Sequence, residues 1–307
     1  MITKIFRTLV SQFTVFTLPF VFVTGELRAT EMDASLEDSE ALIPPSNNLS
    51  VAYGVDNEEN QNFYLSLAKE LKNHAQINMG YSYSQSQASA PSTYQYNAGI
   101  ATSPYELLSL GTEINSWGKE QVLTTQSLRA DIAVNLENWG LTVSPQFNSI
   151  ILYPESGTGD LNISSKGLTL SMGYYGFDYV YFRANYYGST FTSNPISHDT
   201  PVLRTLVLDR LSSHTQTLVS SLEKSHISLS VGTFFEKLTV ELNWTKSESA
   251  FINDITSQPE DITHSFTVFL DRPITDATAI NVSLATQSTD NNSDRINAVE
   301  LGLSYDW

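Results

Sequence analysis

Apolar and polar residues alternate with a period of two along this 307-residue chain, from position 49 to the last residue. In the first such stretch the apolar residues are Leu49, Val51, Tyr53 and Val55, and smaller or polar residues separate them. The alternation returns in segments of about ten residues throughout the rest of the chain. Side chains that repeat every second residue lie on one face of a β-strand. The pattern therefore predicts an all-β protein built from long strands with one apolar and one polar face.

Short and long connections alternate between these segments. Longer polar loops separate six expected tight turns, which lie at Lys72-Asn73, Ser103-Pro104, Asn138-Trp139-Gly140, Tyr175-Gly176, Glu236-Lys237 and Asp271-Arg272-Pro273. Transmembrane barrels alternate in this way, because short turns lie on one side of the membrane and longer loops on the other. The order of connections favours an up-and-down antiparallel meander.

The polar phase of the alternation distinguishes a membrane barrel from a soluble sheet. A soluble sheet places charges on its outer face, but only 16% of this chain is charged, whereas it contains 39 Ser and 30 Thr. Strands of about ten residues suit a tilted membrane crossing better than the five or six residues usual in soluble sheets. We therefore expect residues 49–307 to form a transmembrane β-barrel with a polar lumen and an apolar surface in lipid.

Sixteen strands are preferred for this barrel, and fourteen are the alternative. The two numbers differ in how residues 201–235 are divided. This stretch has room for three strands with tight connections, although residues 203–211 (LRTLVLDRL) lack clean alternation. If the stretch holds one strand and an inserted helix, the count falls to fourteen, which keeps the even number usual in bacterial barrels.

Two segments that precede the barrel differ from it in composition. Residues 1–25 are typical of a secretory signal peptide, because Lys4 and Arg7 precede an apolar run from 14 to 23 that is too short to span a bilayer as a helix. Residues 26–48 carry six acidic residues and the lone cation Arg28. Such a segment buries too little surface to offset its chain entropy. We expect an exported protein with a flexible acidic periplasmic leader; a plug or a docking peptide is the alternative.

The final eight residues, ELGLSYDW, combine a glycine with two aromatic residues at Gly302, Tyr305 and Trp307. This ending resembles the C-terminal assembly signal of Gram-negative outer-membrane β-barrels, a porin-like class. The resemblance implies a location in the cell outer membrane and contact with outer-membrane lipid and lipopolysaccharide. It also implies recognition by the barrel-insertion machinery.

Several charged residues fall in the polar phase and are expected to line the lumen. They are Glu113, Arg129, Asp131, Glu137, Arg183, Glu241, Glu300 and Asp306. Six carboxylates against two guanidiniums would favour cations over anions in a water-filled pore. The alternative is that these charges pair across strands and brace the wall.

Other chemistries have little support in the sequence. The absence of cysteine excludes disulfides and thiolate metal sites. A lipid hydrolase would need a serine activated by a histidine, and His226 with Ser228 or His264 with Ser265 supplies these residue types. Among 39 serines such neighbours arise by chance, and residues 290–294 are typical of a turn rather than of a calcium site. We expect no catalytic, metal or cofactor site.

The expected function is that of a passive or weakly cation-selective channel for small hydrophilic solutes. A non-conducting barrel with a structural, adhesive or export role is the alternative, and an outer-membrane lipid hydrolase comes third. The net charge of −17 argues against nucleic acid as a partner, because nucleic-acid binding relies on Lys and Arg to neutralise phosphates. The sequence shows no obvious long constriction loop of the trimeric-porin type, which slightly favours a monomer.

Overall fold

The structure, a computed structural model, describes residues 47–57, 60–71, 75–85, 92–105, 107–119, 123–153, 161–177, 179–192, 223–235, 237–249, 262–290 and 292–307. Within these ranges the chain forms fourteen antiparallel strands that close into one barrel. The strands are β1 (Asn48–Asp56), β2 (Gln61–Leu71), β3 (Ala75–Gln85), β4 (Thr93–Tyr105), β5 (Leu108–Lys119), β6 (Leu123–Leu136), β7 (Trp139–Leu152), β8 (Leu161–Tyr174), β9 (Val180–Phe191), β10 (Glu223–Phe235), β11 (Leu238–Ser249), β12 (Ile262–Thr275), β13 (Thr278–Thr289) and β14 (Asn292–Asp306).

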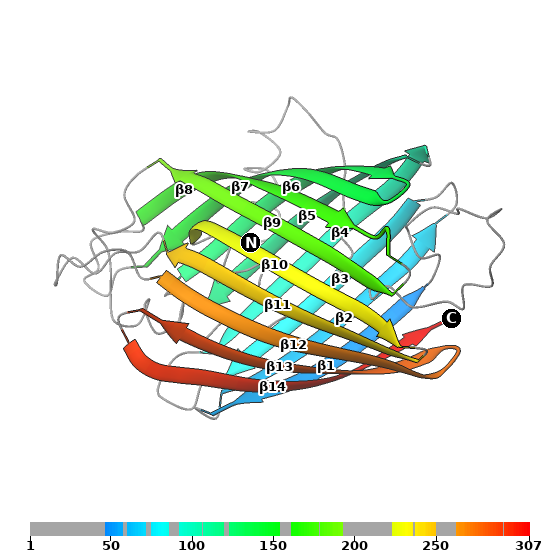
Figure 1. The fold of residues 1–307 in the computed structure, drawn as a ribbon. Helices are drawn as coiled ribbons and strands as arrows, with labels where there is room; N and C mark the ends of the chain where they lie inside the picture. The colour runs from blue at the N-terminus through cyan, green and yellow to red at the C-terminus, as the bar shows by residue number, and fades with distance from the viewer. Residues whose placement is uncertain are drawn as a thin grey trace.

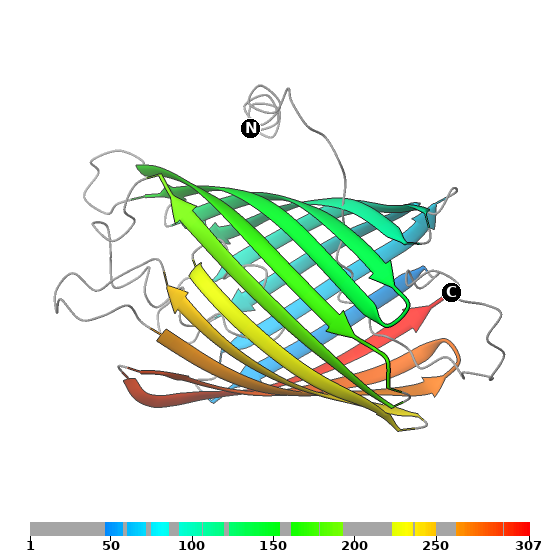
Figure 2. The ribbon, with the colours of Figure 1, turned by 45° about the horizontal axis from the view of Figure 1, so that its top comes forward.

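Each strand pairs with its neighbours in sequence, and β1 pairs with β14. Figure 1 and the turned view in Figure 2 show the strands tilted across the wall, with the blue and cyan strands behind the green and yellow ones. The predicted up-and-down antiparallel barrel is therefore confirmed, with fourteen strands rather than the preferred sixteen. From the stretch 201–235 the structure describes one strand, β10, while residues 193–222 lie outside the described residues. Residues 1–46 also lie outside them, so the signal peptide and the leader stay predictions.

Two of the predicted turns are wrong. Ser103-Pro104 lies inside β4 and Asp271-Arg272-Pro273 lies inside β12. In both strands the pairing register shifts beside the proline. Proline has no backbone N–H to give to the ladder, so within a sheet it occupies irregular positions such as bulges. Tyr175-Gly176 and Lys237 fall between consecutive strands, as does Asn138, whereas Trp139 and Gly140 already belong to β7. Lys72-Asn73 and Glu236 lie outside the described residues.

The backbone closes through a seam between the first and last strands. Here Val51 lies opposite Leu303, and the peptide N–H of Trp307 donates to the carbonyl oxygen of Asn47 over 3.1 Å. We call the end of the barrel that contains this bond the turn end, and the opposite end the loop end. A closed barrel has no edge strand, which is required where lipid offers no hydrogen-bonding partner. Within the described residues, no helix is long and apolar enough to cross a membrane.

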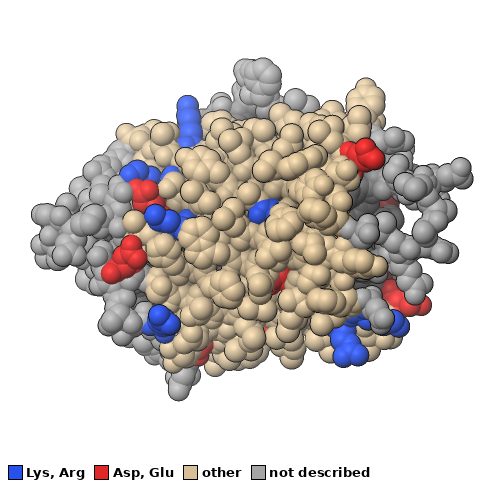
Figure 3. Space-filling view, in the orientation of Figure 1, with Lys and Arg blue, Asp and Glu red and all other residues tan. Residues whose placement is uncertain are grey.

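The apolar phase of the strands points outward and is exposed. Leu301 is 59% exposed, Leu229 is 49% exposed and Leu284 is 43% exposed. Figure 3 shows an almost uncharged belt over the middle of this face, with most Lys, Arg, Asp and Glu gathered toward the two ends. Aromatic rings lie near the turn end, where Trp139 packs against Tyr174 with ring centroids 4.7 Å apart. An apolar belt flanked by aromatic residues is the exterior of an outer-membrane-type barrel.

An arginine in the middle of the belt tests the assignment of this face to lipid. Leu284 lies in the middle of β13, between Val268 and Val299 on the neighbouring strands. Because a charge at the bilayer midplane must be solvated there, Leu284→Arg is expected to lower the free energy of unfolding in lipid vesicles by about 2–4 kcal/mol. Leu284→Met is the matched control, with a cost below about 1.5 kcal/mol. Equal costs for the two variants in denaturant titrations would contradict a lipid-facing position.

Candidate functional site: the barrel interior

The polar phase of the strands points inward and forms a closely packed wall. Inward Ser, Thr, Asn and Gln side chains are almost fully buried on strand after strand. On β7 and β8, the Gln146 amide donates to Asn148 Oδ1 over 2.7 Å, and the Asn148 amide donates to Ser165 Oγ over 2.8 Å. Such networks satisfy polar groups that would be costly to bury alone.

Three of the predicted pore-lining residues meet on β5 and β6. Glu113 and Arg129 are register partners, and Asp131 follows Arg129 on the same face. Arg129 Nε lies 2.8 Å from Asp131 Oδ1, and the exposed fractions are 18% for Arg129 and 1% for Asp131. The Glu113 side chain is only 7% exposed. Two carboxylates thus surround one guanidinium, which leaves the cluster with a net charge of about −1 when all three groups are ionised.

Two further predicted residues meet near the turn end. The guanidinium of Arg183 on β9 pairs with the carboxylate of Glu241 on β11 across the intervening strand β10. The Tyr181 hydroxyl donates to the same carboxylate, and the Arg183 guanidinium lies 5.1 Å from the Tyr181 ring centroid. Tyr175 stacks on the same ring, with centroids 6.0 Å apart. The ion pair therefore braces the wall, as the alternative interpretation expects.

A glycine makes this contact across β10 possible. Gly232 is the register partner of both Tyr181 and Glu241, so the tyrosine ring must pass over it to reach the carboxylate. A Cβ atom at Gly232 would lie 2.1 Å from Tyr181 Cζ. The missing side chain thus provides the space in which the ring lies.

The remaining predicted pore-lining residues differ in where they lie. Glu300 on β14 is inward, 7% exposed, and its Cβ and Cγ pack against the backbone of Gly54. Asp306 is inward at the turn end and accepts a hydrogen bond from the Asn48 amide over 2.7 Å. Glu137 is not in the wall: it lies exposed in the turn between β6 and β7. The prediction that Glu137 lines the pore is wrong because the strand ends one residue earlier, at Leu136.

Four further carboxylates, which are absent from the predicted pore-lining set, lie in the inward phase: Asp56, Glu70, Glu223 and Asp271. Asp271 belongs to a predicted turn, yet in the structure it continues the polar phase of β12, as Asp56 does on β1. Among the inward side chains that the structure describes, carboxylates outnumber guanidiniums. The charge imbalance that the sequence predicts therefore persists in the folded barrel.

Of the five histidines, the structure describes His226 and His264, and neither makes the serine–histidine contact of a hydrolase. His226 is inward, and its Nδ1 lies 2.6 Å from Glu223 Oε2, while the Ser228 hydroxyl donates to Asn243 Oδ1 over 3.2 Å. His264 points outward and stacks on Trp244, whereas Ser265 lies in the opposite phase. Among the described side chains, no group of three or more His, Asp or Glu residues is placed to hold a metal ion.

An apolar patch lies inside the wall near the loop end, where polar residues were expected. Trp117, Leu123, Ile150 and Ile163, on β5 to β8, are inward and at most 2% exposed. Thr125, Ile150 and Ile163 are consecutive register partners. The sequence signal is the run Ile150-Ile151-Leu152, where both phases are apolar. The patch makes this part of the interior dry.

The three residues of the predicted assembly signal lie on the final strand. Tyr305 and Trp307 point outward at the turn end, and their rings stack with centroids 6.1 Å apart. Gly302 faces inward, where a Cβ atom would lie 1.9 Å from Asn281 Oδ1. The stacked rings are thus presented on the surface of the barrel, where another protein can contact them.

No protein-family profile matches the chain, and no curated protein sequence is significantly similar to it. Solved structures with a similar fold include the KdgM porin in complex with disordered oligogalacturonate, at 9% identity and a TM-score of 0.42, covering 85% of this chain and 99% of that one. The NanC porin has 7% identity and a TM-score of 0.45, covering 84% and 98% of the two chains. OccK3 (OpdO) of Pseudomonas aeruginosa has 9% identity and a TM-score of 0.45, covering 85% and 94%.

At TM-scores below 0.5, these structures do not identify the family of this chain. Its class follows from its own structure: a closed barrel whose outward side chains are apolar and whose inward side chains are polar and acidic. The protein is a 14-stranded β-barrel of the outer-membrane type.

Two glycine-to-alanine variants test whether the space above Gly232 is needed for the Tyr181 ring. Gly232→Ala is expected to displace the Tyr181 ring and lower the free energy of unfolding by about 1–3 kcal/mol. Gly140→Ala is the control, because its Cβ would lie 3.7 Å from Tyr175 Cε2, an ordinary van der Waals contact. The control should be neutral or stabilising by about 0.4–1 kcal/mol. Chemical unfolding of both variants measures the difference, and equal effects would show that the Tyr181 contact contributes nothing.

The stacked rings at the turn end are expected to act during assembly. Removing them with Tyr305→Ala and Trp307→Ala should slow folding by the purified insertion machinery several-fold, with little effect on spontaneous folding into thin vesicles. Tyr53→Ala, at an outward position on β1 with 48% exposure, is the control. Gel-shift assays of folded protein over time give both rates. A loss of rate that is equal in the two assays would indicate a purely structural role.

Proposed function

We propose that the protein is a narrow channel of the outer membrane that passes small hydrophilic solutes and favours cations over anions. The observation that carries this proposal is the inversion of the wall, with apolar residues outside and a polar, acidic interior. A membrane barrel needs a polar interior only where that interior meets water or other polar groups. Conduction is the function that such an interior supports best.

The preference for cations is supported by the arrangement of the charges. Each of the two inward arginines that the structure describes has a close carboxylate partner, Asp131 for Arg129 and Glu241 for Arg183. Glu113 and Glu300 add further inward carboxylates on β5 and β14. A negative potential in a low-dielectric channel raises the local concentration of cations.

The narrowness is supported by the packing of the same side chains. Asp131 is 1% exposed, and Glu113 and Glu300 are each 7% exposed. Groups that line a wide water-filled pore would contact much more solvent than this. We therefore expect a conductance well below that of a wide general-diffusion pore.

The first test is to insert refolded protein into planar bilayers and record currents in salt gradients. Discrete small conductance steps with a reversal potential on the cation side are the expected result. The preference should be stronger at 0.01 M salt, where the Debye length is about 30 Å, than at 1 M salt, where it is about 3 Å. Bilayers that stay silent with correctly folded protein would overturn the proposal.

The second test neutralises carboxylates inside and outside the lumen. Glu113→Gln combined with Glu300→Gln should lower the cation-to-anion permeability ratio by roughly two-fold or more at low salt. Glu137→Gln removes the same charge from the exposed turn and should leave the ratio unchanged. If the turn variant changes selectivity as much as the interior pair, the charges inside do not set it.

A non-conducting structural barrel is the second candidate, and the inward apolar patch favours it. Trp117, Leu123, Ile150 and Ile163 are almost fully buried on one side of the interior. A dry patch of this kind narrows the space available to water and ions. The same bilayer recordings separate the two functions, because a structural barrel gives no current at any salt concentration.

A further inference from the structure

A phenyl ring lies among carboxylates on the inner face of β11 to β14. Phe269 is in the inward phase of β12, two residues before Asp271, and its side chain is partly exposed. Its register partner on β11 is Glu241. Its partner on β13 is Ser283, whose own partner on β14 is Glu300. Adjacent strands are about 4.8 Å apart, so the Cα atoms of Phe269 and Glu300 are about 10 Å apart.

The charges around this ring are mostly negative. Glu241, Asp271 and Glu300 come from three different strands, and Asp271 and Glu300 are almost fully buried. The cations that the structure describes in this part of the wall are Arg183, which pairs with Glu241, and Lys237, which is exposed in the turn before β11. Buried carboxylates act through low-dielectric surroundings, so they make the potential at the ring negative.

Further rings extend this surface toward β8. The ring centroids of Phe234 and Tyr181 are 5.2 Å apart, and those of Tyr181 and Tyr175 are 6.0 Å apart. The Tyr181 hydroxyl donates to Glu241, so the row of rings ends at the carboxylate beside Phe269. Phe234 and Tyr175 are partly exposed, whereas Tyr181 is buried. We call Tyr175, Phe234 and Phe269, together with Glu241, the ring site.

Rings beside carboxylates suit one class of cation better than others. Hard inorganic cations are held by oxygen ligands, and a phenyl ring supplies none. An organic ammonium ion carries alkyl groups that pack on a ring, and its charge is attracted to the ring face within about 6 Å of the centroid. Recognition of quaternary ammonium groups by aromatic side chains uses both effects. The ring site therefore has the chemistry for an ammonium ion with alkyl substituents.

We propose that the ring site binds small organic ammonium ions that carry alkyl groups. The alkyl groups pack on Phe269 and Phe234, and the surrounding carboxylates stabilise the positive charge. This binding names the class of solute for the channel and rests on the proposed function, because the ion reaches the rings through a hydrated interior. It predicts that a cation with apolar substituents is held more tightly than a neutral molecule of the same shape.

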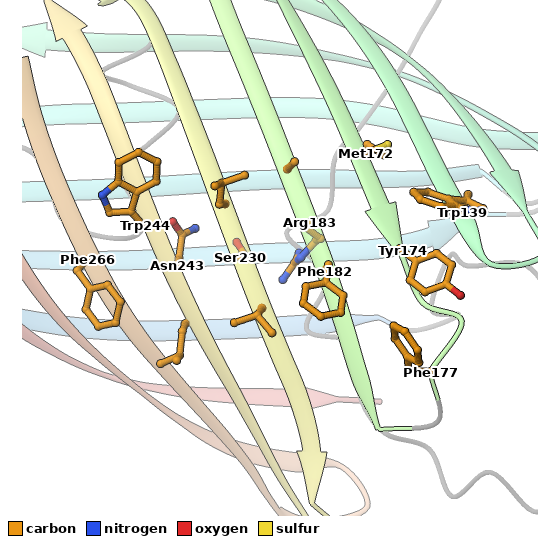
Figure 4. A pocket seen from close by; sticks show the side chains of 14 residues that line it. Trp139, Met172, Tyr174, Phe177, Phe182, Arg183, Ser230, Asn243, Trp244 and Phe266 are labelled. Carbon is orange, nitrogen blue, oxygen red and sulfur yellow. The ribbon is translucent and has the colours of Figure 1, made fainter.

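The test is a ligand-observed NMR titration of choline with the refolded full chain in a non-ionic detergent. The ring variant is Phe269→Leu, which keeps an apolar side chain and removes the aromatic face. Its control is Phe266→Leu, on the opposite face of β12, where Phe266 lines an outer groove with Trp244 (Figure 4). The charge variant is Glu300→Gln, and its control is Glu137→Gln in the exposed turn.

A neutral probe separates charge from shape. The probe is 3,3-dimethylbutan-1-ol, in which a carbon atom replaces the nitrogen of choline, and it should bind the wild type at least five-fold more weakly than choline does. Phe269→Leu should weaken choline binding by about two- to five-fold, because a cation–π contact is worth about 0.5–1 kcal/mol. Glu300→Gln should weaken it by roughly two-fold or more at low salt. Both controls should bind choline as the wild type does.

Three results would overturn the ring site. They are equal affinities for choline and the alcohol, choline binding by Phe269→Leu that equals that of the wild type, or equal losses in the variants and their controls. Circular dichroism and gel mobility identify the variants that fold. If Phe269→Leu does not fold, Glu300→Gln and the neutral probe still decide the question.

Binding and conduction fail separately, because the titration needs no current. A silent bilayer together with bound choline would overturn the channel and leave the ring site in place. A cation-selective current without choline binding would overturn the ring site alone.

Discussion

The inability of lipid to form hydrogen bonds is the constraint on which this structure depends. Every backbone N–H and C=O group within the hydrocarbon must find a partner in the protein, which for strands requires a closed sheet. A sheet that forms the whole wall is one residue thick, so each side chain faces either lipid or the interior. Leu, Val and Ile alternate with Ser, Thr and Asn because successive side chains face lipid and the interior in turn.

The interior shows how a polar wall is made stable without a conventional core. Side chains there satisfy one another in short networks, such as Gln146 with Asn148, and the two inward guanidiniums that the structure describes have carboxylates beside them. Glycines provide space for the larger residues, as Gly232 does for Tyr181. The same packing limits how much water the interior holds. Closer packing of these side chains therefore stabilises the wall but narrows the channel.

The fold class follows from the sequence because period two is a local property that each segment displays by itself. Strand ends are less predictable: proline at positions 104 and 273 suggests turns, yet each is accommodated within a strand where the register shifts. Contacts such as that between Tyr181 and Glu241 depend on the register across three strands, which no single segment specifies. The carboxylates around Phe269 likewise come from β11, β12 and β14. These features become visible only when the strands are placed side by side.

The seam between β1 and β14 has a consequence for the order of folding. Asn48 and Asp306 are hydrogen-bonded although 258 positions separate them. In every other strand pair the two strands are consecutive in the sequence. Closing so long a loop adds only about 0.6 kcal/mol for each doubling of its length, so the seam costs little at equilibrium. The seam does slow folding, because contacts between residues distant in sequence form slowly. Until β1 and β14 meet, both strands are edges with unpaired backbone groups. The half-formed sheet is therefore the aggregation-prone species, and its lifetime is set by how quickly two short stretches at opposite ends of the chain find each other.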